Sequence, residues 1–185
     1  MSAIRKSDVP VIMTAEEYLG WSMGARPAWE LHYGHPVQMQ SESVGHGDVQ
    51  FAIRSACKAA LPRDAPCRPK QGPGVLTTHN DIRIPDVCIE CAPDSDSRSS
   101  LANEPVGIFE VSVISLDYDM GDKRGIYFNN PHVQHYVVVV PDTRAVYHWQ
   151  RGISDPVELS ETGTLDLSPK PGITLDITTF WAELP

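Results

Sequence analysis

The chain has 185 residues, 41% of them hydrophobic, and a formal net charge of −9. This length suits one domain with a hydrophobic core and is short for two. The longest apolar run, Tyr136 to Val140, is far shorter than the roughly 20 apolar residues that a membrane helix needs. No apolar stretch follows Arg5 and Lys6, so we predict no secretory signal, no membrane association and a cytoplasmic location.

The N-terminal part of the chain is predicted to contain a short helix and a β-hairpin. Thr14 and Glu17 have the spacing of a capping box, which marks the start of a helix. Residues 29–33 and 36–39 then form two predicted strands that are joined by a tight turn. The sequence thus predicts a hairpin ahead of the main body of the fold.

The clearest helix is predicted over residues 48–61, because apolar side chains recur there at every third or fourth position. Pro62 ends it. Two strands follow, over residues 82–91 and 106–114, and the polar loop between them suits neighbouring antiparallel strands. A second helix is predicted over residues 119–130.

The C-terminal part adds a nearly continuous apolar strand over residues 133–140, which predicts a central place in the sheet. Another strand is predicted over residues 145–149, and a last apolar segment lies near residues 177–181. No repeat or linker divides the chain. We therefore expect a flexible arm, residues 1–12, followed by a single domain, residues 13–185.

The four cysteines could in principle hold a metal ion or form disulfides. A zinc site that uses Cys88 and Cys91 is disfavoured, because residues three apart in a strand point to opposite faces. No secretory context supports a disulfide framework. We therefore interpret all four residues, which also include Cys57 and Cys67, as small buried side chains.

Two acids are embedded in apolar strands, Asp86 in the first and Glu110 in the second. A carboxylate in a buried strand is costly, and two on adjacent strands repel each other. A divalent cation would remove both costs, since Mg²⁺ prefers oxygen ligands and typically takes one or two carboxylates. The alternative is two unrelated acids, each satisfied by arginine, backbone donors or water.

Lys123 leans toward the apolar side of its predicted helix, between Ile126 and Tyr127. An amine near two carboxylates could stabilise the charge on a phosphate or orient the attacking water. The alternative is a lysine whose stem packs while its amine reaches water. Arg124 lies in the same stripe, so the helical geometry does not single out Lys123.

A basic segment offsets the negative net charge locally, and phosphate binding normally rests on such a surface. Five basic residues lie between positions 54 and 70, namely Arg54, Lys58, Arg63, Arg68 and Lys70. We name Arg54, Lys58 and Lys70 as candidate nucleic-acid contacts, although a solvated helix end is the alternative. His46 is a further candidate, because a helix start favours anions; its alternative role is a cap or surface residue.

Taken together, these motifs resemble a family of small restriction-endonuclease-like proteins in the PD-(D/E)XK nuclease superfamily. The resemblance runs from Thr14 to Trp181 and rests on order and spacing. The segments that carry it are Trp29-Glu30-Leu31, His46 before a long helix, Pro85-Asp86-Val87, Phe109-Glu110-Val111-Ser112, and Tyr118-Asp119 with Lys123 and Tyr127.

The resemblance implies an α/β restriction-endonuclease-like fold in three layers, with a mixed sheet flanked by helices. It implies that Asp86, Glu110 and the carbonyl of Val111 bind Mg²⁺ or Mn²⁺. The usual superfamily lysine would fall at Ser112, and in the small family it comes from the next helix, which matches Lys123. Glu30 matches a further catalytic acid.

The chain also departs from the family pattern. Two acids of the usual Glu-Leu-Val-Asp-Gly-Glu segment are replaced by Tyr33 and His35, and residues 113–115 read Val-Ile-Ser in place of Ser-Pro-Ser. The resemblance implies a metal-dependent DNA endonuclease, for which a homodimer is expected because a duplex has two strands to cut. The alternative is an inactive nucleic-acid-binding or interaction module of the same fold.

Overall fold

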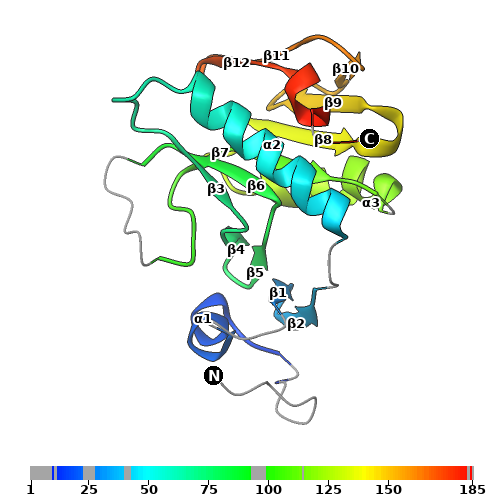
Figure 1. The fold of residues 1–185 in the computed structure, drawn as a ribbon. Helices are drawn as coiled ribbons and strands as arrows, with labels where there is room; N and C mark the ends of the chain where they lie inside the picture. Colours follow the sequence, from blue (N-terminus) through cyan, green and yellow to red (C-terminus); the bar gives the residue numbers. More distant parts are fainter. Residues whose placement is uncertain are drawn as a thin grey trace.

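A mixed β-sheet with the strand order β10-β9-β8-β7-β6-β3 forms the centre of the molecule in the computed structural model (Figure 1). Its strands are β3 (Arg68–Gln71), β6 (Val87–Glu90), β7 (Pro105–Val111), β8 (His135–Val140), β9 (Ala145–Gln150) and β10 (Val157–Ser160). Strand β7 runs parallel to β8, whereas β6 runs antiparallel to β7. The structure describes residues 10, 12–22, 28–39, 43–92, 99–113, 115–182 and 184.

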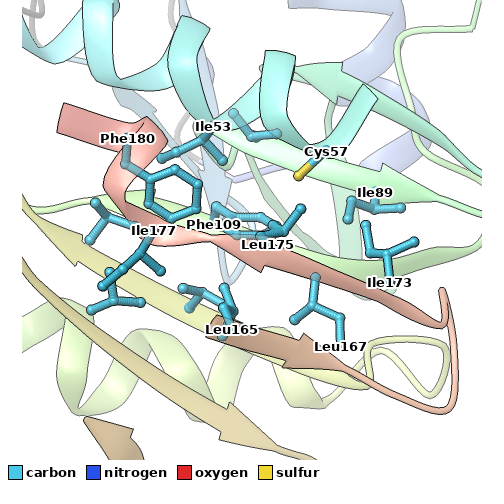
Figure 2. Packing of buried hydrophobic residues seen from close by; sticks show 14 of the residues in the cluster. Ile53, Cys57, Ile89, Phe109, Leu165, Leu167, Ile173, Leu175, Ile177 and Phe180 are labelled. Atoms are coloured by element: carbon cyan, nitrogen blue, oxygen red, sulfur yellow. The ribbon is translucent and has the colours of Figure 1, made fainter. Parts of the chain in front are cut away.

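Helices cover both faces of this sheet. Helix α2 (Val44–Ala60) lies on one face, together with the hairpin of β11 (Thr164–Leu167) and β12 (Ile173–Asp176) and the 3-10 helix η3 (Ile177–Trp181). Figure 2 shows Ile53 and Cys57 of α2 packed over Phe109 of β7. The opposite face carries α3 (Leu116–Met120) and α4 (Asp122–Phe128). The predicted α/β fold, a mixed sheet flanked by helices, is confirmed.

Side-chain alternation along the strands builds the two cores. In β6, Val87 and Ile89 join the core under α2, whereas Cys88 joins the core under α4. In β7, Phe109 faces α2 and Ile108 faces the opposite side. This alternation is the period-2 pattern of a strand that is buried on both faces.

The predicted hairpin is present and belongs to a second, smaller sheet with the order β2-β1-β5-β4. The bounds of its elements are β1 (Trp29–His32), β2 (His35–Gln38), β4 (Val75–Thr78) and β5 (Asp81–Arg83). Helix α1 (Ala15–Ser22) begins at the predicted capping box, where the Thr14 N–H donates to Glu17 Oε2 at 2.7 Å. The predicted arm of residues 1–12 falls mostly outside the described residues.

The strand predicted over residues 82–91 is wrong as a single element. The chain leaves β5 at Arg83 and enters β6 at Val87, and the two strands belong to different sheets. Pro85 lies in the gap, and proline has no N–H for a ladder hydrogen bond. Asp86 therefore precedes β6 rather than lying inside it.

Both predicted helix boundaries also shift. Helix α2 begins at Val44, not near residue 48, because the Ser43 side chain caps it by accepting from the His46 N–H at 3.2 Å. Gly45 and Gly47 are poor helix formers, which hid this first turn in the sequence. The helix predicted over residues 119–130 is instead two helices, α3 and α4, which meet at Gly121.

The interpretation of all four cysteines as unpaired side chains is wrong. Cys67 and Cys91 form a disulfide, and Cys57 and Cys88 are free and buried. The disulfide joins the positions just beyond the Arg68–Glu90 register pair of β3 and β6, so the antiparallel pairing brings the two sulfurs together. Within the described residues, no helix is long and apolar enough to cross a membrane.

Candidate active site

The end of β7 and the start of β6 place Asp86 beside Glu110. These strands pair antiparallel with Val87 opposite Phe109, so a register one residue longer sets Asp86 opposite Glu110. The Val111 N–H donates to Asp86 Oδ2 at 2.5 Å and fixes this arrangement. Two acids that are 24 positions apart in the sequence thus meet where β6 begins and β7 ends.

Asp86 is held mainly from the α2 side of the sheet. Its Oδ1 atom lies 2.9 Å from His46 Nε2 and accepts a hydrogen bond from Gln50 Nε2 at 2.6 Å. His46 and Gln50 are one turn apart on α2, so both side chains project from the same face of the helix. Gln71 Nε2 in turn donates to Gln50 Oε1 at 2.8 Å, which orients the amide.

Glu110 is buried, with 3% of its surface exposed, and its side-chain contact comes from α4. Its Oε2 atom lies 2.9 Å from Lys123 Nζ, whereas Oε1 has no hydrogen-bond partner in the described part of the chain. Burial raises the pKa of Glu110 to about 8, and the charge of Asp86 adds to the rise while Lys123 opposes it. The positive charge of Lys123 alone therefore does not keep the Glu110 carboxylate fully ionised near neutral pH.

Lys123 lies between two carboxylates, of which only Glu110 was expected beside it from the sequence. Besides the contact with Glu110, its Nζ atom lies 3.3 Å from Oδ1 of Asp119, one turn earlier in the chain. Burial opposes the charge on Lys123, but Glu110 and Asp119 outweigh it and hold the pKa of Lys123 above its usual value. The amine is therefore a permanent positive charge. Ser112, at the position of the superfamily's usual lysine, is buried.

Glu30 faces the same region from β1. Its Oε1 atom accepts the Ile84 N–H at 2.8 Å, and its Oε2 atom lies 2.6 Å from His32 Nε2. Burial works against ionisation of Glu30, but these hydrogen bonds and the charge of Lys123 keep its pKa below the usual value. Glu30 is therefore an ionised carboxylate whose two oxygens both have donors.

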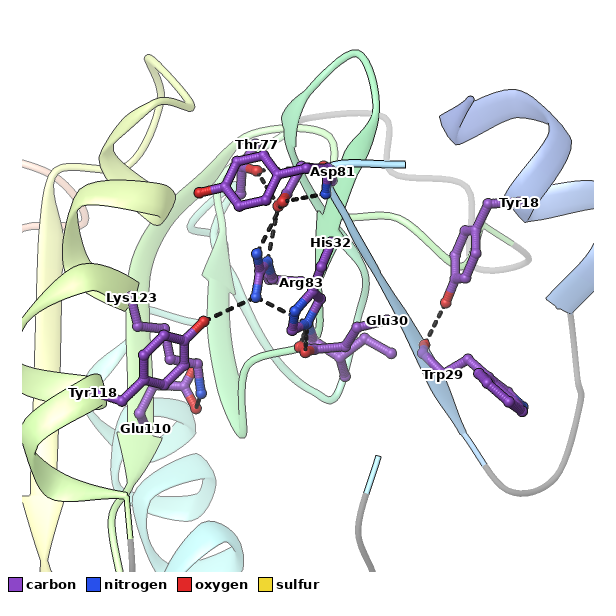
Figure 3. A network of polar contacts seen from close by, with 12 residues as sticks. Tyr18, Trp29, Glu30, His32, Thr77, Asp81, Arg83, Glu110, Tyr118 and Lys123 are labelled. Atoms are coloured by element: carbon purple, nitrogen blue, oxygen red, sulfur yellow. Dashed lines mark hydrogen bonds and ion pairs between the residues drawn. The ribbon is translucent and has the colours of Figure 1, made fainter. Parts of the chain in front are cut away.

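A buried arginine of β5 connects Asp81 of the smaller sheet to Tyr118 of α3 (Figure 3). Arg83 is 1% exposed and binds Asp81 through two parallel hydrogen bonds of 2.9 Å. Its Nη1 atom lies 2.9 Å from His32 Nε2 and donates to the Tyr118 hydroxyl at 3.0 Å. His32 Nε2 also lies 2.6 Å from Glu30, and we assign its N–H as the donor of this shorter contact. A protonated Nε2 cannot accept from Arg83, so Arg83 Nη1 donates to the Tyr118 hydroxyl instead.

These residues fit a hard divalent cation of the Mg²⁺ type. Mg²⁺ binds proteins through one or two carboxylates, and waters and substrate phosphate complete its octahedron. Glu110 Oε1 is a buried oxygen with no hydrogen-bond partner among the described residues, and Asp86 is adjacent. No group of three or more His, Cys, Asp or Glu side chains in the described ranges could hold a metal ion by itself. Any cation here would depend on water or substrate for its remaining ligands.

The candidate nucleic-acid contacts do not gather at this site as one group. His46 reaches it through Asp86. Arg54 is exposed on α2 eight residues further along, about 12 Å at the helical rise, and Lys58 lies one turn beyond it. Lys70 forms an ion pair with the buried Glu90, so its charge is already compensated.

Sequence reasoning missed three residues of the site. Gln50 and Asp119 are buried polar side chains that contact Asp86 and Lys123, respectively. Gln50 lies four positions after His46, and Asp119 lies four positions before Lys123. That spacing from His46 and Lys123 was a usable signal. Arg83 carried no such signal, because its role depends on the pairing of β5 with β1 in the smaller sheet.

Comparison with known proteins identifies the family and the fold of this chain. The family model described as "Uma2: Putative restriction endonuclease" matches residues 15–179, which is most of the chain. The chain belongs to the Uma2 family. Among solved structures, it is similar to one titled as a putative nuclease belonging to DUF820 from Anabaena variabilis, with a TM-score of 0.68 and 16% sequence identity. That match covers 92% of this chain and 98% of the other, and it shows that this Uma2 protein has the fold of that structure.

A sequence relative comes from a Synechocystis sp. strain. The uncharacterized protein slr1290 is 25% identical over 138 residues, which covers 69% of this chain and 68% of the relative. Its name carries no activity. The match spans about two thirds of each chain.

Proposed function

We propose that this Uma2 protein is a metal-dependent endonuclease that hydrolyses phosphodiester bonds in DNA. Asp86 and Glu110, with the carbonyl of Val111, would hold Mg²⁺ or Mn²⁺. When bound, such a cation polarises a phosphoryl oxygen and lowers the pKa of a coordinated water. The observation that carries this proposal is Glu110, a buried acid beside Asp86 with one oxygen that accepts no hydrogen bond from the described residues.

The protein's own residues supply orientation and charge. His46 and Gln50 hold one oxygen of Asp86, and the Val111 N–H holds the other, so this carboxylate has a fixed direction. Lys123 places a positive charge beside Glu110. In the proposed reaction, this charge would stabilise the negative charge that develops on the scissile phosphate. Such preorganised charge needs no rearrangement during the reaction.

Glu30 has a supporting role in this proposal. Both of its oxygens accept hydrogen bonds from His32 and the Ile84 N–H, so it offers less free coordination capacity than Glu110. Its charge still contributes to the raised pKa of Lys123. We propose that Glu30 keeps Lys123 charged and orients water at the edge of the site.

A plasmid-nicking assay with Mg²⁺ or Mn²⁺ tests the assignment. Asp86→Asn and Glu110→Gln should each lower the rate by roughly 100-fold or more, the scale of removing a main electrostatic group. Asp155→Asn, which changes an exposed acid, is the matched control and should cleave normally. Undiminished nicking by Asp86→Asn would reject the site.

The competing proposal is a binding module that keeps the fold without cleavage. The net charge of −9 and the double pairing of Lys123 with Glu110 and Asp119 favour it. This alternative would be supported if the wild type shifts DNA in a gel but nicks plasmid with none of the divalent metals tested. For cleavage of both strands we propose a homodimer, which sedimentation of the wild type would test.

A further inference from the structure

A pocket of about 400 Å³ lies beside the candidate active site, between the β1–β2 hairpin and helices α3 and α4. This volume is within the ~300–1,000 Å³ range of small-ligand sites. Its lining residues are His32, Tyr33, Arg83, Tyr118, Asp122, Gly125, Ile126 and Asn129. His32 also contacts Glu30, and Asp122 precedes Lys123 on α4, so the pocket shares walls with the site.

Two exposed tyrosines flank this pocket. Tyr33 is 56% exposed and Tyr118 is 40% exposed, although both contribute large rings. Tyr33 has a φ of 50°, and with Gly34 at 89° it forms the tight turn of the hairpin. This left-handed conformation suits glycine or asparagine, so a tyrosine there is strained. The Tyr33 N–H donates to Asp81 at 3.0 Å, which fixes the turn.

The charges around the pocket argue against phosphate as its ligand. Arg83 is buried and already binds Asp81 through two hydrogen bonds and Tyr118 through a third. Asp122 is exposed at the rim and would repel an anion. Arg83 lies over one face of the Tyr33 ring, 5.7 Å from its centroid, so stacking is left to the other face. A flat, uncharged ring fits better, because it can stack there and the Asn129 and Asp122 side chains can bond its edge.

We propose that this pocket takes up one unpaired nucleobase of the nucleic-acid substrate. The inference rests on the proposed nuclease function and adds a preference for a base that is single-stranded or flipped out of a duplex. In a duplex, every base is stacked and must be flipped out before such a pocket can reach it. With a base held beside Tyr33 and Tyr118, the phosphate attached to it would lie toward Glu110 and Lys123.

Binding measured in EDTA tests the pocket without any cleavage. The probes are a fluorescent oligothymidylate, the same strand in a duplex, and an abasic strand of equal length. Wild type should bind the single strand more tightly than the duplex, and Tyr33→Asn should weaken single-strand binding about tenfold. Asparagine tolerates the turn's backbone, so the variant removes the ring without threatening the fold.

Two further measurements complete the test. Tyr33→Trp, which keeps a stacking ring, should bind like wild type, and Tyr118→Leu should bind as weakly as Tyr33→Asn. The abasic strand should bind wild type and Tyr33→Asn equally. Any of three results would overturn the base-pocket proposal. Tyr33→Asn could lose as much affinity for the abasic strand as for the intact strand, Tyr33→Asn could bind the single strand as tightly as wild type, or wild type could show no preference for the single strand over the duplex. Metal-dependent nicking of plasmid would still stand in those cases, so the two proposals fail separately.

Discussion

Lys123 of α4 and Glu110 of β7 form a buried ion pair with 2.9 Å between Nζ and Oε2, and Asp119 adds a second carboxylate at 3.3 Å. Three charged groups thus share a space from which water is largely excluded. Such an arrangement is stable only as a whole, because removal of one charge leaves the others unpaired in a poorly solvating environment. The pair is therefore both a catalytic candidate and a structural requirement.

Lys123→Met should destabilise the fold by about 3 kcal/mol, since Glu110 and Asp119 lose their buried counter-charge. Urea denaturation gives this free energy of unfolding directly. Lys170→Met is the matched control, because the Lys170–Glu104 pair is solvent-exposed and should contribute less than about 1 kcal/mol. Equal losses in both variants would show that the Lys123 pairs are energetically ordinary.

Divalent cations should raise the unfolding temperature of the wild type, because a bound cation relieves the repulsion between Asp86 and Glu110. At a hundredfold excess over Kd, the gain in unfolding free energy is about 3 kcal/mol. Thermal scans with EDTA, Mg²⁺ and Mn²⁺ measure it. Glu110→Gln should lose this gain, whereas Asp155→Asn should keep it; a gain of equal size in Glu110→Gln would place the cation elsewhere.

Arg83→Met should cost about 3–5 kcal/mol of stability, because Asp81 is buried and would lose both of its arginine hydrogen bonds. Arg83→Lys should recover only part of that loss, since one ammonium cannot reproduce a bidentate contact. Chemical denaturation of both variants checks the order. Arg54→Met, on the exposed face of α2, should change the unfolding free energy by less than about 0.5 kcal/mol.

Acid should destabilise the protein through a buried histidine pair. His135 Nδ1 lies 2.9 Å from His148 Nε2, and His135 Nε2 lies 3.1 Å from the Lys170 carbonyl oxygen. His135 therefore donates to that carbonyl and accepts from His148. Burial and the neighbouring His148 lower the pKa of His135 to about 4, and burial also lowers the pKa of His148.

The sign of the pH effect follows from proton uptake. Between about pH 6.5 and 4 the unfolded chain binds a proton at His135 that the folded chain does not, so stability falls as the pH falls. The loss approaches roughly 3 kcal/mol at pH 4. The difference in unfolding free energy between pH 7 and 5 should shrink in His135→Gln. His132→Gln, an exposed histidine variant, should keep the wild-type difference; no change in His135→Gln would contradict the pair's role.

Periodic patterns predicted most of the architecture. The nearly continuous apolar run of residues 133–140 identified a central strand, and the period of α2 identified its buried face. The errors lie where one local feature decided the outcome. Pro85 separates β5 from β6 although the residues on both sides are apolar, and Gly121 divides one expected helix into two.

The candidate site was predictable as a set of residues but not as a geometry. Asp86, Glu110 and Lys123 could be named from their apolar surroundings and the family resemblance, and the structure brings them together. The four-residue spacing of Gln50 from His46 and of Asp119 from Lys123 was a local signal, but the contacts of Asp86 and Arg83 depend on strand register and helix packing, which no local pattern encodes. The disulfide between Cys67 and Cys91 depends in the same way on the β3–β6 pairing.

Asp86 is anchored from α2 and Glu110 from α4, on opposite sides of the same sheet. Assembly of this centre consequently requires both flanking layers to dock, and a partly folded intermediate with one layer detached would hold only one of the acids correctly. The proposed nuclease activity would therefore arise only after both layers have docked.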